Sequence, residues 1–212
     1  MPTYTQLNEK LLQIDLHGEE VLAKKGSMVA FKGEIVFQGA LLSGGRLSEV
    51  AMRQVTGEGL KLMKAKGRGE VLYAYQGQYL SLISLEGERM YIESDNVLAF
   101  DSSLRSGTEF LGNQGGASGL IRGAMSGQGL FCTTLEGRGR CAVLSSGDLV
   151  ELGVSGNTVC VDPQAYIAHK GNLTVSIHTD LGWKNLIGQN SGEGFQLKFV
   201  GQGSVYLQAD ER

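Results

Sequence analysis

The chain has 212 residues, of which 42% are hydrophobic, so it is long enough to bury a core and too apolar to be disordered. Its 19 basic and 22 acidic side chains leave a formal net charge of −3, which excludes the overall positive charge that drives most non-specific binding to nucleic acids or anionic lipids. The 32 glycines and two prolines favour many short strands joined by turns over a helical bundle.

Nothing in the sequence indicates export or membrane insertion. Residues 1–9 are polar and unlike a signal peptide, and no window approaches the roughly 20 apolar residues of a membrane-spanning helix. Three cysteines without a Cys-x-x-Cys spacing argue against a disulfide framework. We therefore expect a cytoplasmic protein with no membrane span.

Three stretches of the sequence recur at a fixed interval of 69 positions. The interval separates three glycines from one another and three alanines from one another: Gly18, Gly87 and Gly156, and Ala30, Ala99 and Ala168. Such a period predicts a supersecondary unit copied in tandem, each copy burying its apolar face against its siblings. We place the units at about 10–76, 79–146 and 148–208, within one compact domain spanning 1–212.

Each unit begins with two predicted strands. The first strands, 11–16, 80–85 and 149–154, alternate between aliphatic and polar or small residues with the period of two that a half-buried strand requires. We expect a turn at the repeated glycine and then a second strand, around Leu22 in the first unit, that pairs back on the first.

A third predicted strand is apolar at consecutive positions, which implies burial on both faces. It covers 28–31, 97–100 and 166–169, and alanine is the only residue shared by all three copies. We hypothesise that these alanines meet at a pseudo-threefold axis, where close approach would require a small side chain.

The next segment of each unit favours one or two helical turns. These segments are 45–53, 117–125 and 181–187, and we predict short helices that lie over a sheet. The last segment contains Trp183, the sole tryptophan, which is interpreted as a core anchor, with contact to another subunit or to a membrane surface as the alternative.

Each unit closes with a predicted hairpin that carries pairs of glycines. The pairs begin at Gly57, Gly67, Gly127, Gly137, Gly192 and Gly201. We interpret them as turns or bulges rather than a phosphate-binding loop, because they flank strands and no Gly-Lys-Ser/Thr follows. A turn at Glu136-Gly137 would place Cys132 opposite Cys141, and we expect reduced core thiols there, with oxidation as the alternative.

These features together resemble the bacterial members of the altered inheritance of mitochondria protein 24 family. The resemblance rests on the three Gly-x-Gly-Leu/Phe hairpins and on residues 24–33, and it covers nearly the whole chain. It implies a fold like that of the tryptophan RNA-binding attenuator protein (TRAP), a shortened relative of the double-stranded β-helix. It implies no reaction and supplies no site residues.

In a repeat protein, an active site should show as a departure from the repeat, and few departures occur. His169 stands where the other units have Phe31 and Phe100, but His17 and His178 lack metal-ligand spacing, so a surface or core histidine is the preferred interpretation. We predict no catalytic residue, metal or cofactor, and we nominate no small-molecule ligand.

The sharpest functional hint is a basic row. Lys64, Lys66 and Arg68 alternate along one predicted strand and so point to one side. Binding of RNA or another anion by this row is the alternative function, although the acidic chain makes a nucleic-acid partner the less favoured one.

The sequence thus predicts an all-β fold of three tandem antiparallel units with pseudo-threefold symmetry and short helical insertions. The preferred function is that of a non-enzymatic structural or protein-interaction protein, acting as a homo-oligomer or with a protein partner. Nearly equivalent units supply extended surfaces but no convergent reactive side chains.

Overall fold

The computed structural model describes residues 1–40, 60–111, 131–178 and 196–209. In these residues the protein is all-β, as predicted: twelve strands form one sheet, and Ser94–Asn96 form a single 3₁₀ turn. The predicted short helices and Trp183 lie outside the described residues, as do the first glycine pairs of the closing hairpins.

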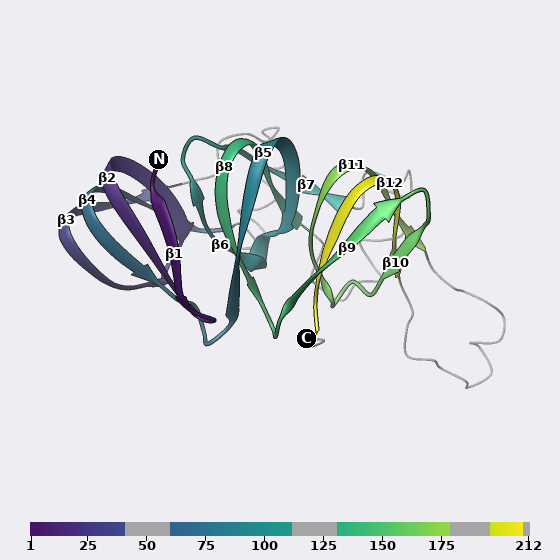
Figure 1. Cartoon of the computed structure of the whole chain (residues 1–212), viewed down its shortest axis with the longest axis horizontal. Coiled ribbons are helices and arrows are strands. Elements are labelled where there is room, and N and C mark those ends of the chain that lie inside the picture. Colours follow the sequence, from purple (N-terminus) through teal and green to yellow (C-terminus); the bar gives the residue numbers. More distant parts are fainter. Residues whose placement is uncertain (41–59, 112–130, 179–195, 210–212) are drawn as a thin grey trace.

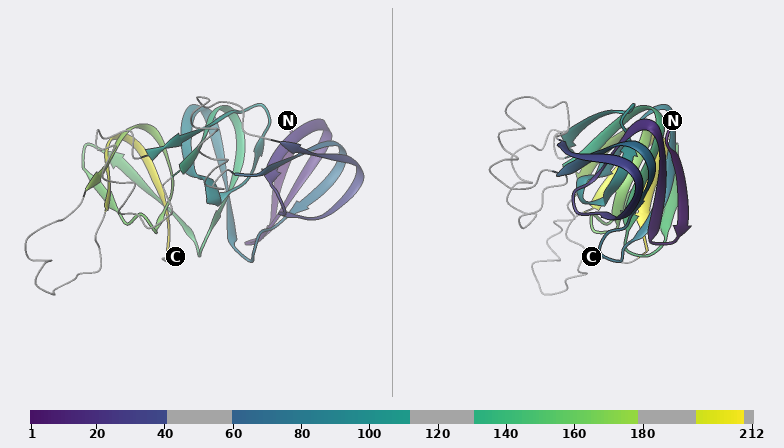
Figure 2. Two further views of the ribbon diagram at one scale, coloured as in Figure 1. Left: turned by 180° about the vertical axis from the view of Figure 1, so that it is seen from behind. Right: turned by 90° about the vertical axis from the view of Figure 1, so that its left-hand side faces the viewer.

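The strands are β1 (Thr3–Asn8), β2 (Leu11–Lys24), β3 (Met28–Ala40), β4 (Leu62–Tyr73), β5 (Tyr79–Glu93), β6 (Val97–Asp101), β7 (Arg105–Phe110), β8 (Phe131–Ser145), β9 (Leu149–Ser155), β10 (Val159–Val161), β11 (Tyr166–His178) and β12 (Gln196–Gln208). They pair antiparallel in the order β10-β12-β11-β5-β8-β6-β2-β4-β3, with β1 on β2, β7 on β8 and β9 on β12. Figure 1 shows them as three groups in a row: β1–β4, β5–β8 and β9–β12. The views from behind and from the end agree (Figure 2).

The predicted first strands are confirmed as parts of β2, β5 and β9, and the predicted alternation is clearest in β2. Leu12, Ile14 and Leu16 are buried, whereas Gln13 and Asp15 between them are only half-buried. This pattern follows from the pleat of a strand, which turns successive side chains to opposite faces of the sheet.

The predicted turn at the repeated glycine is wrong in the first two units, where the strand continues through Gly18 and Gly87, whereas in the third unit the chain leaves β9 at Ser155 and Gly156 lies between β9 and β10. In β2, Gly18 and Glu19 lie opposite the single residue Gly67 of β4, which makes a β-bulge. The positive φ of Gly18, 114°, belongs to this bulge, and β5 has the same irregularity at Gly87. A bulge bends its strand, and the second half of β2 pairs with β4 of its own group on one side and with β6 of the next group on the other.

The second glycines of the predicted closing hairpins do not form turns either. Gly67 and Gly69 lie inside β4, where the backbone of β3 comes so close that a Cβ atom on either glycine would overlap a backbone oxygen. Likewise Gly137 lies inside β8, so Cys132 and Cys141 are on one strand and do not face each other. Both thiols are buried and reduced, as expected.

Burial of the predicted third strand on both faces is confirmed for two of its three occurrences. All of β6 is buried, and so is 166–169 of β11, but Val29, Ala30 and Phe31 of β3 are exposed. The difference arises because β6 and β11 each pair with a strand of the preceding group, whereas β3 pairs only with β4 among the described strands.

The expected meeting of three alanines at a common axis is wrong. Ala99 belongs to the first hydrophobic core and Ala168 to the second, while Ala30 is exposed. Because each group passes a strand edge to the next, the groups extend in a line and do not close around a centre (Figure 1).

Candidate functional site at the two ends of the sheet

The groups are joined by short antiparallel pairings that follow one rule. At the first junction Leu22 of β2 pairs with Phe100 of β6, and Ala23 pairs with Ala99. At the second junction Tyr91 of β5 pairs with His169 of β11, and the adjacent residues follow in the same register. Adding 69 to each residue number of the first junction gives the second junction, residue by residue.

One end of the sheet is β3, which pairs with β4 along one edge and with no other described strand. We call Val29–Phe31 the β3 edge. Val29 is 59% exposed and Phe31 49% exposed, whereas Leu98 and Phe100, at the matching positions of β6, are fully buried. The β3 edge therefore has the composition of a buried strand without a neighbour that buries it.

The other end of the sheet is β10, which pairs with β12 and with no other described strand. We call Val159–Val161 the β10 edge. Val161 is buried, Val159 is half-buried and Cys160 between them is exposed, and one edge of the strand has no partner among the described strands. Next to this edge, Val150 and Leu152 of β9 are also exposed.

An open sheet edge with exposed apolar side chains can bind another β-strand. Backbone N–H and C=O groups that lack a strand neighbour can pair with another strand, and exposed apolar side chains favour the pairing because it removes them from water. The two ends are thus candidate interaction sites, and neither depends on a reactive side chain.

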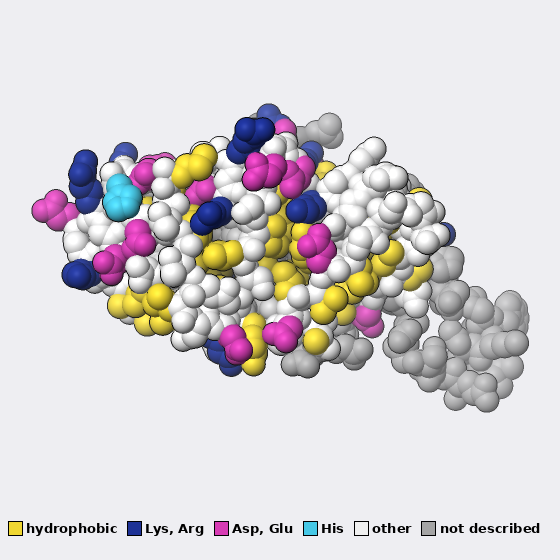
Figure 3. All heavy atoms as spheres, in the orientation of Figure 1, with side chains coloured by type: hydrophobic (Ala, Val, Ile, Leu, Met, Phe, Trp, Pro, Cys, Tyr) yellow, Lys and Arg dark blue, Asp and Glu magenta, His cyan; other side chains and the backbone are white. Residues whose placement is uncertain are grey.

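The structure places the predicted basic row on β4 and brings its members to one face. Ala65 between Lys64 and Lys66 is fully buried, so the two lysines project to the opposite side. Glu20 of β2 lies 3.0 Å from Lys64 Nζ and 3.9 Å from Lys66 Nζ, which compensates part of their charge. Figure 3, which shows one face of the molecule, has basic and acidic side chains interspersed. The row borders an open groove of about 730 Å³.

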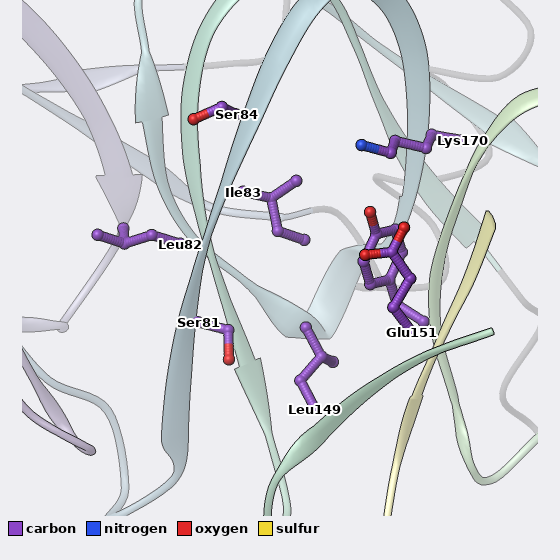
Figure 4. A pocket seen from close by; sticks show the side chains of 8 residues that line it. Ser81, Leu82, Ile83, Ser84, Leu149, Glu151 and Lys170 are labelled. Atoms are coloured by element: carbon purple, nitrogen blue, oxygen red, sulfur yellow. The ribbon is translucent and has the colours of Figure 1, made fainter. Parts of the chain in front are cut away.

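A smaller hollow of about 310 Å³ lies between the second and third groups. Figure 4 shows Ile83 of β5 and Leu149 of β9 lining it, with Lys170 of β11 and Glu151 of β9 across from β5. Burial alone would lower the pKa of Lys170, but contact with the hydroxyl of Tyr206 and the charges of Glu88 and Glu151 raise it. Lys170 therefore stays charged. Its ion pair with Glu88, at 3.6 Å, links β11 to β5 at the second junction.

His169, which replaces the phenylalanine of the other two units, is a core histidine. Its ring stacks on Tyr91 at a centroid distance of 4.5 Å, and its Nδ1 lies 2.8 Å from the hydroxyl of Tyr166. The same hydroxyl lies 3.7 Å from the thiol of Cys132. Burial raises the pKa of Cys132 well above its usual range and lowers that of His169 to about 4, so at neutral pH both groups are uncharged.

Taken together, the fold and its ends define an all-β protein whose antiparallel sheet, in the described residues, has an unpaired strand edge at β3 and another at β10. The chain belongs to the family described as mitochondrial biogenesis AIM24, whose family model matches residues 4–210. This confirms the resemblance that the glycine hairpins indicated. No helix in the described residues is long and apolar enough to cross a membrane.

Relatives of the chain come from bacteria. It is 30% identical to the uncharacterised protein M6_Spy0233 of Streptococcus pyogenes serotype M6 over 213 residues, which cover 94% of this chain and 81% of that protein. The chain is also similar to the crystal structure of protein SPYM3_0169 from Streptococcus pyogenes, with a TM-score of 0.73 and 26% sequence identity. The similarity covers 100% of this chain and 94% of the SPYM3_0169 chain.

Sequence reasoning missed the two ends of the sheet. It aligned Met28–Phe31 with its two copies and expected the same burial for all three. No local signal separates the three copies, because β6 and β11 owe their burial to long-range pairing with the preceding group.

Proposed function

We propose that this protein is a non-enzymatic structural or interaction protein that acts through self-association. The single observation that carries the proposal is the exposure of Val29 and Phe31 on an unpaired strand edge. Long, exposed apolar edges promote pairing with other chains, and natural monomers usually protect them with charges, prolines or bulges. The β3 edge carries no charge and no proline, and its bulge at Val29 recurs in β6 and β11, which both pair with the preceding group.

A non-enzymatic role is supported by the state of the groups that could react. Cys132 and His169 both contact the hydroxyl of Tyr166, and both are buried in the core. Burial raises the pKa of the thiol of Cys132, which removes the thiolate that nucleophilic attack needs. We therefore assign these residues to the core and name no cofactor.

For the finer fold assignment we infer three tandem units of the TRAP-like type, arranged in a line. The support is the interval of 69 residues that relates the two junctions. Binding of RNA by Lys64, Lys66 and Arg68 is the less favoured function, because Glu20 pairs with both lysines and the chain is acidic overall.

Light scattering coupled to size-exclusion chromatography tests self-association. The expected mass is larger than that of one 22.7 kDa chain, and it should rise with protein concentration. A Val200→Arg variant serves as the control, because Val200 is 43% exposed but lies on β12, which pairs on both sides. It should associate like the wild type. A constant mass of one chain across the concentration range would contradict the proposal.

A further inference from the structure

We propose that the β10 edge of one molecule pairs with the β3 edge of a second copy, head to tail, and so continues the sheet from chain to chain. This inference rests on the proposed self-association and specifies its geometry. In this contact Cys160 lies directly opposite Phe31 of the next copy, and Val161 lies opposite its Ala30.

The register follows from the two junctions inside the chain. The first junction pairs Leu22 with Phe100, and the second pairs Tyr91 with His169. One further step of 69 residues on the first partner gives Cys160. One step of 69 residues back from Phe100, the second partner at the first junction, gives Phe31. The two open ends are therefore the two halves of a third junction of the same kind.

The hydrophobic cores lead to the same pairing. The first core includes Leu98 and Ala99, which the following group contributes through β6. The second core includes Ile167 and Ala168, which the following group contributes through β11. The third core, around Val161 and Phe199, receives no such strand from the described chain.

Val29 and Ala30 are the residues that match these contributed pairs, and both are exposed. If β3 paired with β10 of another copy, Val29 and Ala30 would pack against the third core of that copy, as Leu98 and Ala99 pack in the first core. The pairing thus buries Val29, the more exposed of the two large side chains of the β3 edge, against the third core, which receives no strand from a following group in the described chain.

The contact is heterologous, because the β3 edge and the β10 edge differ in sequence and neither junction pairs a strand with its own equivalent. A symmetric contact between two β3 edges would leave both third cores incomplete. A head-to-tail contact leaves one edge of each kind free on every complex, so that further copies can add until a ring closes.

Disulfide trapping in a Phe31→Cys variant tests the register. Residues directly opposite in an antiparallel pair have Cα atoms roughly 4.5–5.5 Å apart, within the range of about 4.4–6.8 Å that a disulfide spans. Both positions are exposed in the single chain, so the substitution leaves the core intact. Cys132 and Cys141 remain in place because both thiols are buried.

Mild oxidation of Phe31→Cys should give a ladder of chains linked in multiples of 22.7 kDa on a non-reducing gel. The ladder should be lost in Phe31→Cys with Cys160→Ser. It should also be absent in Val36→Cys, which places an exposed thiol farther along the same strand. Links that persist without Cys160, or no links in a protein that self-associates, would overturn the head-to-tail register and leave the proposed function standing. A protein that stays monomeric in light scattering would overturn both.

Discussion

Gly67→Ala is expected to cost about 3–5 kcal/mol of the free energy of unfolding, which is exceptional for the addition of one methyl group. Gly67 has a φ of 146°, where residues with a Cβ are strained, and its backbone lies against β3. A Cβ would overlap the carbonyl oxygen of Glu34 and come within 3.0 Å of its carbonyl carbon. Because these atoms belong to the backbone, a side-chain rotation cannot relieve the overlap.

Gly39→Ala is the matched control for Gly67→Ala. Gly39 lies on the same pair of strands, opposite Met63, but a Cβ there meets no atom within 4 Å. Its unfolding free energy should stay within about 0.5 kcal/mol of the wild type. Urea denaturation followed by circular dichroism measures both variants. Equal, small effects would show that β3 and β4 are not in close backbone contact at Gly67.

Acidification is expected to destabilise the protein through His169. Burial lowers the pKa of His169 from 6.5 to about 4, so between these values the unfolded chain binds a proton that the folded chain excludes. Stability is therefore lost as pH falls from 6.5 to 4, by about 3 kcal/mol for this one group, at about 1.4 kcal/mol per pKa unit. Above pH 6.5 the ring is neutral in both states and contributes no pH dependence.

His169→Phe should remove this part of the pH dependence. Phenylalanine occupies the matching positions 31 and 100, so its shape suits the repeat. The measurement is the unfolding free energy at pH 7 and pH 4.5, compared between variant and wild type. Carboxylates titrate in both proteins and cancel in the difference. The control, His17→Gln, removes an exposed histidine and should follow the wild type. An unchanged slope in His169→Phe would show that folding does not exclude a proton from His169.

The strands and much of the core could be predicted from the sequence, because they depend on local alternation. Leu12, Ile14 and Leu16 are buried as the period of two requires, and the consecutive apolar residues of β6 are buried on both faces. The family assignment also followed from local features, namely the glycine pairs and the segment that leads into β3.

The path of the chain between strands could not be predicted in the same way. A glycine with positive φ serves a turn and a bulge equally well, so Gly18 and Gly87 gave a turn signal although their strands continue. The linear order of the groups depends on long-range pairing of β6 with β2, which no local pattern encodes. The site likewise depends on long-range pairing, because Val29 and Phe31 have the same local signature as Leu98 and Phe100, which are buried.

Mixing two end-blocked variants tests the head-to-tail contact most directly. Phe31→Arg disables the β3 edge and leaves the β10 edge intact, while Cys160→Arg does the reverse, and both substitutions are at exposed positions. Each variant alone should be monomeric in sedimentation-velocity ultracentrifugation, because each lacks one half of the contact. An equimolar mixture should form a 1:1 dimer and nothing larger, since only one pairing of intact edges remains. Dimers of either variant alone, or no dimer in the mixture, would contradict pairing of β10 with β3.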